Sequence, residues 1–136
     1  MSPVKVMVVD DDEGLRECVC EHLHDDGYVA VSADNGLSAL GRLRAEPRKP
    51  DLILLDLTMP IMDGWEFLLN LDNHPELRKI PVALMRAHST ILRAFDADWD
   101  KYGFTRLLLP KPLDMTRLLS IVRGVCHASG TFVKPS

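Results

Sequence analysis

The chain of 136 residues has no apolar stretch that approaches the roughly 20 residues needed to cross a membrane. Its first residues also lack the charged and apolar regions of a signal peptide. Cysteine is scarce and odd in number, and Cys18, Cys20 and Cys126 have spacings that indicate neither a disulfide framework nor a metal site. We therefore expect a cytoplasmic protein with reduced thiols and no membrane partner.

The chain also lacks an excess of positive charge. Lys and Arg number 16 against 20 Asp and Glu, so the formal net charge is −4. Nucleic-acid binding needs Lys and Arg clustered on one face, so this balance argues against a nucleic-acid partner. Repeats and low-complexity segments are absent, and 46% hydrophobic with 26% charged residues is typical of one soluble domain. We expect that domain to span residues 1–127, followed by a flexible C-terminal tail over 128–136.

Short apolar runs alternate with amphipathic segments along the chain, as in βαβ units that build a parallel sheet. The first and third apolar runs are apolar at nearly every position, which places them in the centre of the sheet. With right-handed crossovers, the sequence predicts an α/β fold: a flavodoxin-like (βα)5 doubly wound parallel sheet with strand order 2-1-3-4-5. The expected strands are residues 4–9, 28–33, 51–56, 80–85 and 107–109, and the expected helices are 13–26, 36–45, 65–71, 90–102 and one capped by Asp114.

Charged residues stand where three of these buried strands end. An acidic run, Asp10 to Asp12, follows the first strand, Asp56 ends the third, and Lys111 follows the fifth. Ligands of open parallel sheets bind beyond the carboxyl ends of the strands, so these side chains are expected to share one pocket. Two carboxylates about 4 Å apart repel by roughly 4 kcal/mol at an effective dielectric near 20. A hard cation such as Mg²⁺ would relieve that repulsion.

Three motifs carry a resemblance to a known family. They are the acidic run Asp10-Asp11-Asp12 after Val8-Val9, the run from Leu54 to Gly64 that reads LLDLTMPIMDG, and the pair Lys111-Pro112. Together, in this order, they resemble the receiver domain of bacterial two-component response regulators, of the stand-alone chemotaxis type. The resemblance covers residues from about 4 to 127.

The resemblance implies a phosphoacceptor at Asp56, and a carboxylate can act as a nucleophile that forms an aspartyl phosphate. It implies that Lys111 is the catalytic lysine, joined to Pro112 by a cis peptide bond. For Mg²⁺ it implies Asp10, Asp11 and Asp56 as ligands, with Asp11 binding directly, Asp10 acting directly or through a bound water, and Thr58 offering its backbone carbonyl. Asp12 stands one step too far along, and we expect it to cap the helix that follows.

The switch positions depart from the family pattern. Receivers usually place Ser or Thr at the end of the fourth strand, followed by a small residue, and here Arg86 and Ala87 occupy these places. Arg86 would either clamp the phosphoryl oxygens or pair with Asp56 and compete with Mg²⁺, and an arginine turned to solvent is the plainer alternative. Leu108 stands where an aromatic residue is usual. We expect altered coupling between phosphorylation and output.

The implied function is that of a phosphoacceptor in a two-component phosphorelay, which is a signalling domain and not an enzyme in the ordinary sense. Its expected partners are a sensor histidine kinase or histidine phosphotransfer protein, and a downstream protein that binds the face of the fourth helix, fifth strand and fifth helix. It is expected to be a monomer or weak dimer. One alternative is a pseudo-receiver that signals without phosphate. A remote alternative is a small phosphohydrolase of the haloacid dehalogenase kind, although Thr58 stands where that family needs a second acid.

Overall fold

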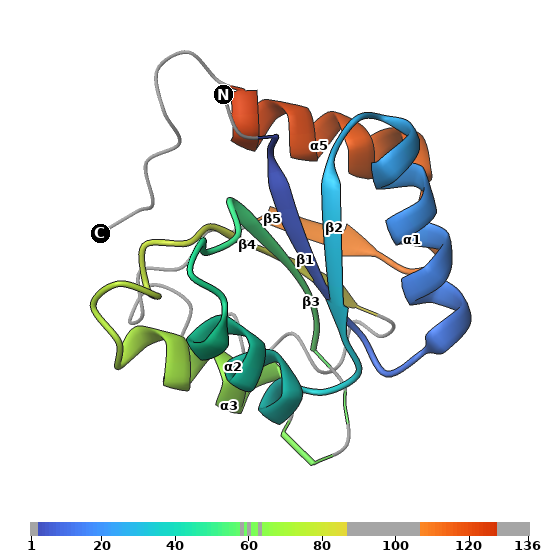
Figure 1. The fold of residues 1–136 in the computed structure, drawn as a ribbon. Helices are drawn as coiled ribbons and strands as arrows, with labels where there is room; N and C mark the ends of the chain where they lie inside the picture. Colours follow the sequence, from blue (N-terminus) through green and yellow to red (C-terminus); the bar gives the residue numbers. More distant parts are fainter. Residues whose placement is uncertain (1–2, 58, 60, 63, 87–106, 128–136) are drawn as a thin grey trace.

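Strands and helices alternate along the described part of the chain. The computed structural model describes residues 3–57, 59, 61–62, 64–86 and 107–127. No helix within these ranges is both long and apolar enough to pass through a bilayer. The elements are β1 (Lys5–Val9), α1 (Glu13–Asp25), β2 (Val29–Ala33), α2 (Gly36–Ala45), β3 (Leu52–Asp56), α3 (Gly64–Asp72), β4 (Val82–Arg86), β5 (Leu107–Pro110) and α5 (Met115–His127) (Figure 1).

The described strands form one parallel sheet in the order β2-β1-β3-β4-β5. This order and the flavodoxin-like architecture confirm the fold predicted from the sequence. The boundaries differ by a residue or two. For example, β4 begins at Val82 and not at residue 80, because the Ile80 amide bonds back to Leu77 and Pro81 has no amide hydrogen. The expected helix over 90–102 and the expected tail over 128–136 lie outside the described residues.

Polar side chains start the first two helices. Asp12 accepts a hydrogen bond from the Leu15 amide at the start of α1, and Asn35 accepts one from the Ser38 amide at the start of α2. Each bond satisfies one of the amides that a first helical turn leaves without a partner. The capping expected for Asp12 is therefore confirmed, and both caps lie just beyond a strand end.

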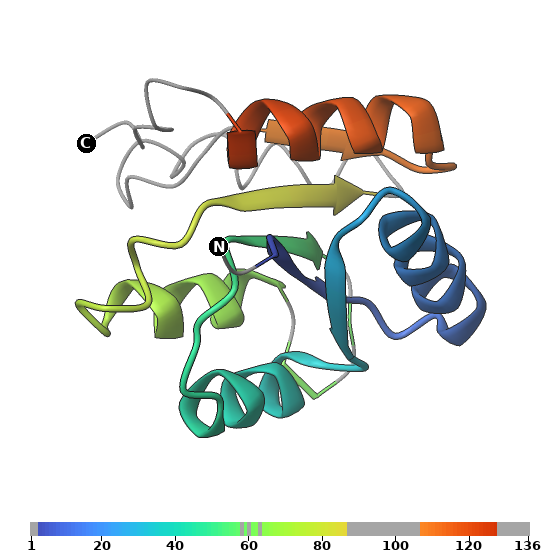
Figure 2. The same ribbon diagram turned by 45° about the horizontal axis from the view of Figure 1, so that its top comes forward.

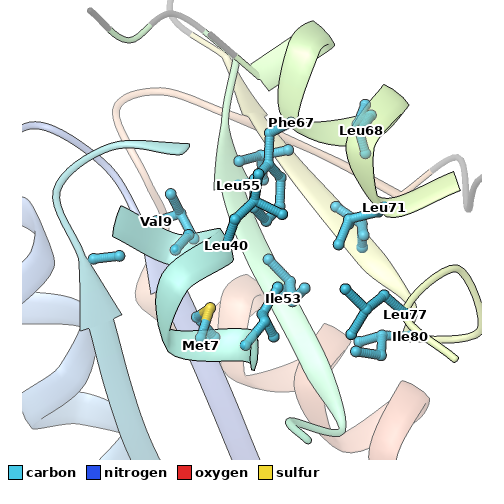
Figure 3. Packing of buried hydrophobic residues seen from close by; sticks show 14 of the residues in the cluster. Met7, Val9, Leu40, Ile53, Leu55, Phe67, Leu68, Leu71, Leu77 and Ile80 are labelled. Carbon is cyan, nitrogen blue, oxygen red and sulfur yellow. The ribbon is translucent and has the colours of Figure 1, made fainter. Parts of the chain in front are cut away.

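Helices cover both faces of the sheet, so the central strands are buried on each side (Figures 1 and 2). One core lies beneath α2 and α3, where Phe67 and Leu71 pack against Ile53 and Leu55 of β3 (Figure 3). The other core lies beneath α1 and α5, which bring Leu23 and Leu118 to the opposite face. Every residue of β3 is buried, as its continuous apolar sequence predicts.

Gly64, the first residue of α3, lies against the end of β3. A Cβ atom placed on it would be 2.8 Å from the Leu57 Cα and 2.9 Å from the Asp56 carbonyl oxygen. The Gly64 amide donates to the Leu57 carbonyl at 3.1 Å. Only glycine permits this approach, so α3 is held directly behind the carboxyl end of β3.

We expect the substitution Gly64→Ala to lower the free energy of unfolding by about 1–3 kcal/mol, because its methyl group would push α3 away from β3. Chemical denaturation measures this change. Gly124→Ala in α5 is the matched control, since nothing lies within 4 Å of a Cβ there. Because alanine is the better helix former, the control is expected to gain roughly 0.5–1 kcal/mol. Equal effects of the two substitutions would show that the close approach is not required.

Candidate functional site

The register of the sheet brings Asp10 and Asp56 together. β1 pairs with β3 so that Val9 lies opposite Leu55, and the two aspartates come next in line. Side chains alternate between the two faces of a strand, so each aspartate lies on the face of the residue two positions before it. Those residues, Val8 and Leu54, both belong to the core beneath α1 and α5. The two carboxylates therefore meet at the same corner of the sheet.

Asp11 joins them from the start of the β1–α1 loop. Each of the three aspartates offers one carboxylate oxygen, and these oxygens lie within 4.8 Å of one another. Asp10 is fully buried and Asp56 is 3% exposed, whereas Asp11 is exposed. Burial removes water that would otherwise screen the charges, so the repulsion within this cluster is strong. The site needs positive charge nearby.

Lys111 supplies part of that charge. It follows β5, which is separated from β3 by β4. Its side chain therefore has to extend past the end of β4 to reach Asp10 and Asp56. Its Nζ atom donates to Asp10 Oδ2 at 2.8 Å and lies 3.5 Å from Asp56 Oδ1. Burial alone would lower the pKa of Lys111, but the hydrogen bond to Asp10 and the charge of Asp56 outweigh it and raise the pKa. Lys111 therefore stays charged at neutral pH.

Asp10 is held through both its backbone and its side chain. Its amide donates to the Ala33 carbonyl at 3.2 Å, and its Oδ1 atom accepts from the Asp12 amide at 2.9 Å. Lys111 holds the other carboxylate oxygen, so each oxygen has a partner. Asp11 lacks such burial and faces the solvent side of the cluster. It is the carboxylate best placed to meet an incoming ion.

The donor set fits Mg²⁺. Magnesium takes oxygen ligands at about 2.0–2.1 Å, keeps several waters, and uses only one or two protein carboxylates directly. Among the described residues, the three clustered carboxylates face the ammonium of Lys111, so the formal charges of these four groups, three negative and one positive, sum to −2. A divalent cation would balance them. Such an ion would sit at the exposed side, next to Asp11, where water can complete its coordination.

The structure describes the other predicted site residues only in part. Arg86 is the last residue of β4, and its backbone pairs with Pro110. Leu108 lies within β5, paired with Leu84. The side chains of Arg86 and Leu108, and the whole of Thr58 and Ala87, lie outside what the structure describes. The Lys111–Pro112 peptide bond is cis, as the resemblance implies.

Two residues at this corner were not predicted from the sequence. Arg16 of α1 donates from Nη1 to the Asp10 carbonyl at 2.7 Å, and Gly64 packs against the Asp56 carbonyl. A basic residue one turn into the helix that follows an acidic run is a signal that could have indicated Arg16.

The three cysteines are free thiols, and burial raises the pKa of Cys126 to about 11.

Comparisons with known proteins give the family. The family model of the response regulator receiver domain matches residues 6–123. The chain is 37% identical over 122 residues to the "Probable transcriptional regulator ycf29" of Pyropia yezoensis, covering 89% of this chain and 52% of that protein. It is 31% identical over 126 residues to the "Response regulator MprA" of Mycolicibacterium vanbaalenii, covering 90% and 50%. The chain therefore spans about half the length of these relatives.

Solved structures agree with this result. The chemotaxis protein CheY4 of Vibrio cholerae matches with a TM-score of 0.75 and 27% identity, over 90% of this chain and 98% of that one. The signal receiver domain of a histidine kinase from Syntrophus aciditrophicus matches with a TM-score of 0.79 and 26% identity, over 98% and 97%. The chain belongs to the response regulator receiver family and is a domain of two-component signalling.

We expect Lys111→Met to lower the free energy of unfolding in metal-free buffer by about 1–3 kcal/mol, because it leaves the buried Asp10 carboxylate without its counterion. Added Mg²⁺ should restore more stability to this variant than to the parent chain. Thermal melting with and without Mg²⁺ measures both effects. Lys79→Met, at an exposed position, is the matched control. A variant that melts like this control would contradict the role of the ion pair.

Proposed function

We propose that the chain accepts a phosphoryl group on Asp56 and that Mg²⁺ and Lys111 assist the transfer. The supporting observation is the convergence of three carboxylates and one ammonium at the carboxyl ends of the strands. Two of these carboxylates are buried, and one ammonium does not offset the charge of all three, so the arrangement favours a metal-dependent reaction. The proposed Mg²⁺ ligands are carboxylate oxygens of Asp11 and Asp56 and the backbone carbonyl of Thr58, with Asp10 acting directly or through a bound water.

The proposed donor is a phosphohistidine of a kinase or phosphotransfer protein. A carboxylate oxygen of Asp56 attacks phosphorus in line, so an oxygen–phosphorus bond forms while the nitrogen–phosphorus bond breaks. The electron pair of the broken bond returns to the imidazole, which takes up a proton. Lys111 shifts from the carboxylates toward a phosphoryl oxygen and stabilises its charge. When bound, Mg²⁺ would neutralise charge on the phosphoryl oxygens. Hydrolysis of the acyl phosphate later resets the site.

Receiver domains interact with histidine kinases and with downstream effectors, and they are signalling domains and not enzymes in the ordinary sense. For this chain we propose that the signal leaves by protein contact, through the face that includes β5 and α5. The added charge of roughly −1.5 to −2 on Asp56 would bias that face between two states.

We place the domain boundary near His127, where α5 ends. A location in the cytoplasm follows from the proposed kinase partner.

Phosphorylation at Asp56 is tested by incubation with acetyl phosphate and Mg²⁺, followed by intact-mass measurement. The parent chain is expected to gain one phosphoryl group, and Asp56→Asn is expected to gain none, because an amide cannot form an acyl phosphate. Asp25→Asn, at an exposed position at the end of α1, is the matched control and should be labelled like the parent.

Other outcomes of this experiment would favour other functions. A phosphoryl group that persists in Asp56→Asn would move the acceptor elsewhere. No labelling of any variant would favour the pseudo-receiver, an interaction module that keeps the fold without phosphate; Arg86 and Leu108 are the residues that keep that alternative open. A separate assay with a generic aryl phosphate tests the phosphohydrolase, which steady turnover would favour.

Arg86 is proposed to alter the coupling of phosphorylation to output, because it takes the place of a hydroxyl residue at the end of β4. We expect Arg86→Thr to change both the Mg²⁺ affinity and the labelling rate. Tighter Mg²⁺ binding and faster labelling would show that the arginine competes with the cation, and slower labelling would show that it clamps phosphoryl oxygens. Magnesium titration with timed mass measurement distinguishes these two. Values equal to those of the parent chain would eliminate Arg86 as a determinant.

A further inference from the structure

Within the described part of the chain, Arg16 contacts the acidic corner through a backbone carbonyl. It lies in the second turn of α1, and its Nη1 atom donates to the Asp10 carbonyl oxygen at 2.7 Å. Its own amide donates to the Asp12 carbonyl at 2.9 Å, so the start of α1 is bonded to the loop from two sides. A guanidinium hydrogen bond of this length is charge-assisted and among the stronger hydrogen bonds in proteins.

The carbonyl that Arg16 binds belongs to the peptide unit between Asp10 and Asp11. β1 ends at Val9, so this carbonyl lies beyond the ladder between β1 and β3, whose last pair is Val9 and Leu55. A buried carbonyl needs a partner, and here Arg16 provides it. Because the peptide unit is planar, a bond that holds this carbonyl restricts the orientation of the whole unit, which includes the Cα atoms on both sides. Those two Cα atoms carry the two carboxylates.

We propose that Arg16 is a positioning residue: by binding the carbonyl between Asp10 and Asp11, it sets the directions in which these two carboxylates present their oxygens to Mg²⁺. The metal-binding part of this inference rests on the proposed function. The remaining contacts of Asp10 do not replace this bond. The Ala33 carbonyl holds its amide, and the Asp12 amide and Lys111 hold its carboxylate oxygens. The Asp12 contact closes a turn around the peptide that leads to Asp11, but none of these three contacts binds the carbonyl of that peptide.

On removal of Arg16, this proposal and a purely electrostatic role predict opposite changes in Mg²⁺ affinity. Arg16 is a cation close to a cation site, so its charge by itself disfavours Mg²⁺. Removal of that charge would therefore tighten Mg²⁺ binding if charge were the only effect. If the hydrogen bond orients Asp10 and Asp11, removal of the arginine weakens Mg²⁺ binding although a repulsive charge has gone. The direction of the change separates the two.

The experiment compares Arg16→Met, Arg16→Lys and the control Arg44→Met, which lies at an exposed position of α2. Calorimetric titration of the full chain with MgCl2 is expected to show roughly tenfold weaker binding for Arg16→Met, the low end of the effect known for groups that orient metal ligands. Arg16→Lys keeps the charge but has a shorter reach, so a smaller loss is expected. The control should bind like the parent chain.

A second measurement needs no metal. Amide hydrogen exchange in the metal-free chain reports on the Asp12 amide, which donates to Asp10 Oδ1. Arg16→Met is expected to speed exchange at Asp12 several-fold and to leave Ser38 unchanged, since the Ser38 amide donates to Asn35 at the start of α2. A global loss of stability would speed exchange at both positions. Arg16→Lys provides the same comparison if the methionine variant does not fold.

Unchanged or tighter Mg²⁺ binding by Arg16→Met would overturn the proposal, and so would Arg16→Lys binding at the level of the parent chain. Equal changes in exchange at Asp12 and Ser38 would also overturn it, because they would show a merely structural role. If the parent chain itself takes up no Mg²⁺, the proposed function fails, while the exchange experiment still tests whether Arg16 orders the loop.

Discussion

The corner of the sheet depends on one ion pair. Asp10 is fully buried, and the ammonium of Lys111 is its charged partner at 2.8 Å. Without that contact, a carboxylate would lie in a low-dielectric environment beside the carboxylate of Asp56. Lys111 also lies 3.5 Å from Asp56, so a single positive charge is shared between two negative ones. The pair leaves the cluster with excess negative charge, which is the physical reason that a divalent cation fits there.

The backbone around this pair is held from several directions. Gly64 lets α3 approach the end of β3, Asp12 caps α1, and Arg16 binds the carbonyl between the first two aspartates. None of these residues has to touch a phosphoryl group to matter. Each restricts the backbone next to a charged side chain, and electrostatic catalysis depends on charged groups that are held in place before the reaction. The proposed chemistry therefore depends on the loops as much as on the carboxylates.

Membership of the receiver family fixes the class of this chain, and the proposals concern what it does within that class. Its curated relatives are about twice as long, so their activities as whole proteins are not those of a receiver domain alone. Arg86 and Leu108 are the residues that are expected from the sequence to alter the coupling of phosphorylation to output. Arg86 is the last residue of β4, and Leu108 lies within the neighbouring strand β5.

The sequence by itself determined the fold and most members of the site. Continuous apolar strands such as residues 52–55 must be covered on both faces, and that requirement selects the strand order. The charged residues that follow the strands then lie together at the carboxyl ends of the strands, so Asp10, Asp56 and Lys111 were expected to meet. Only the tertiary structure decided that Lys111 bonds Asp10 more closely than Asp56, and that Arg16 holds the Asp10 carbonyl. Those choices depend on side-chain reach and on the directions of backbone carbonyls, which periodicity and spacing along a chain do not encode.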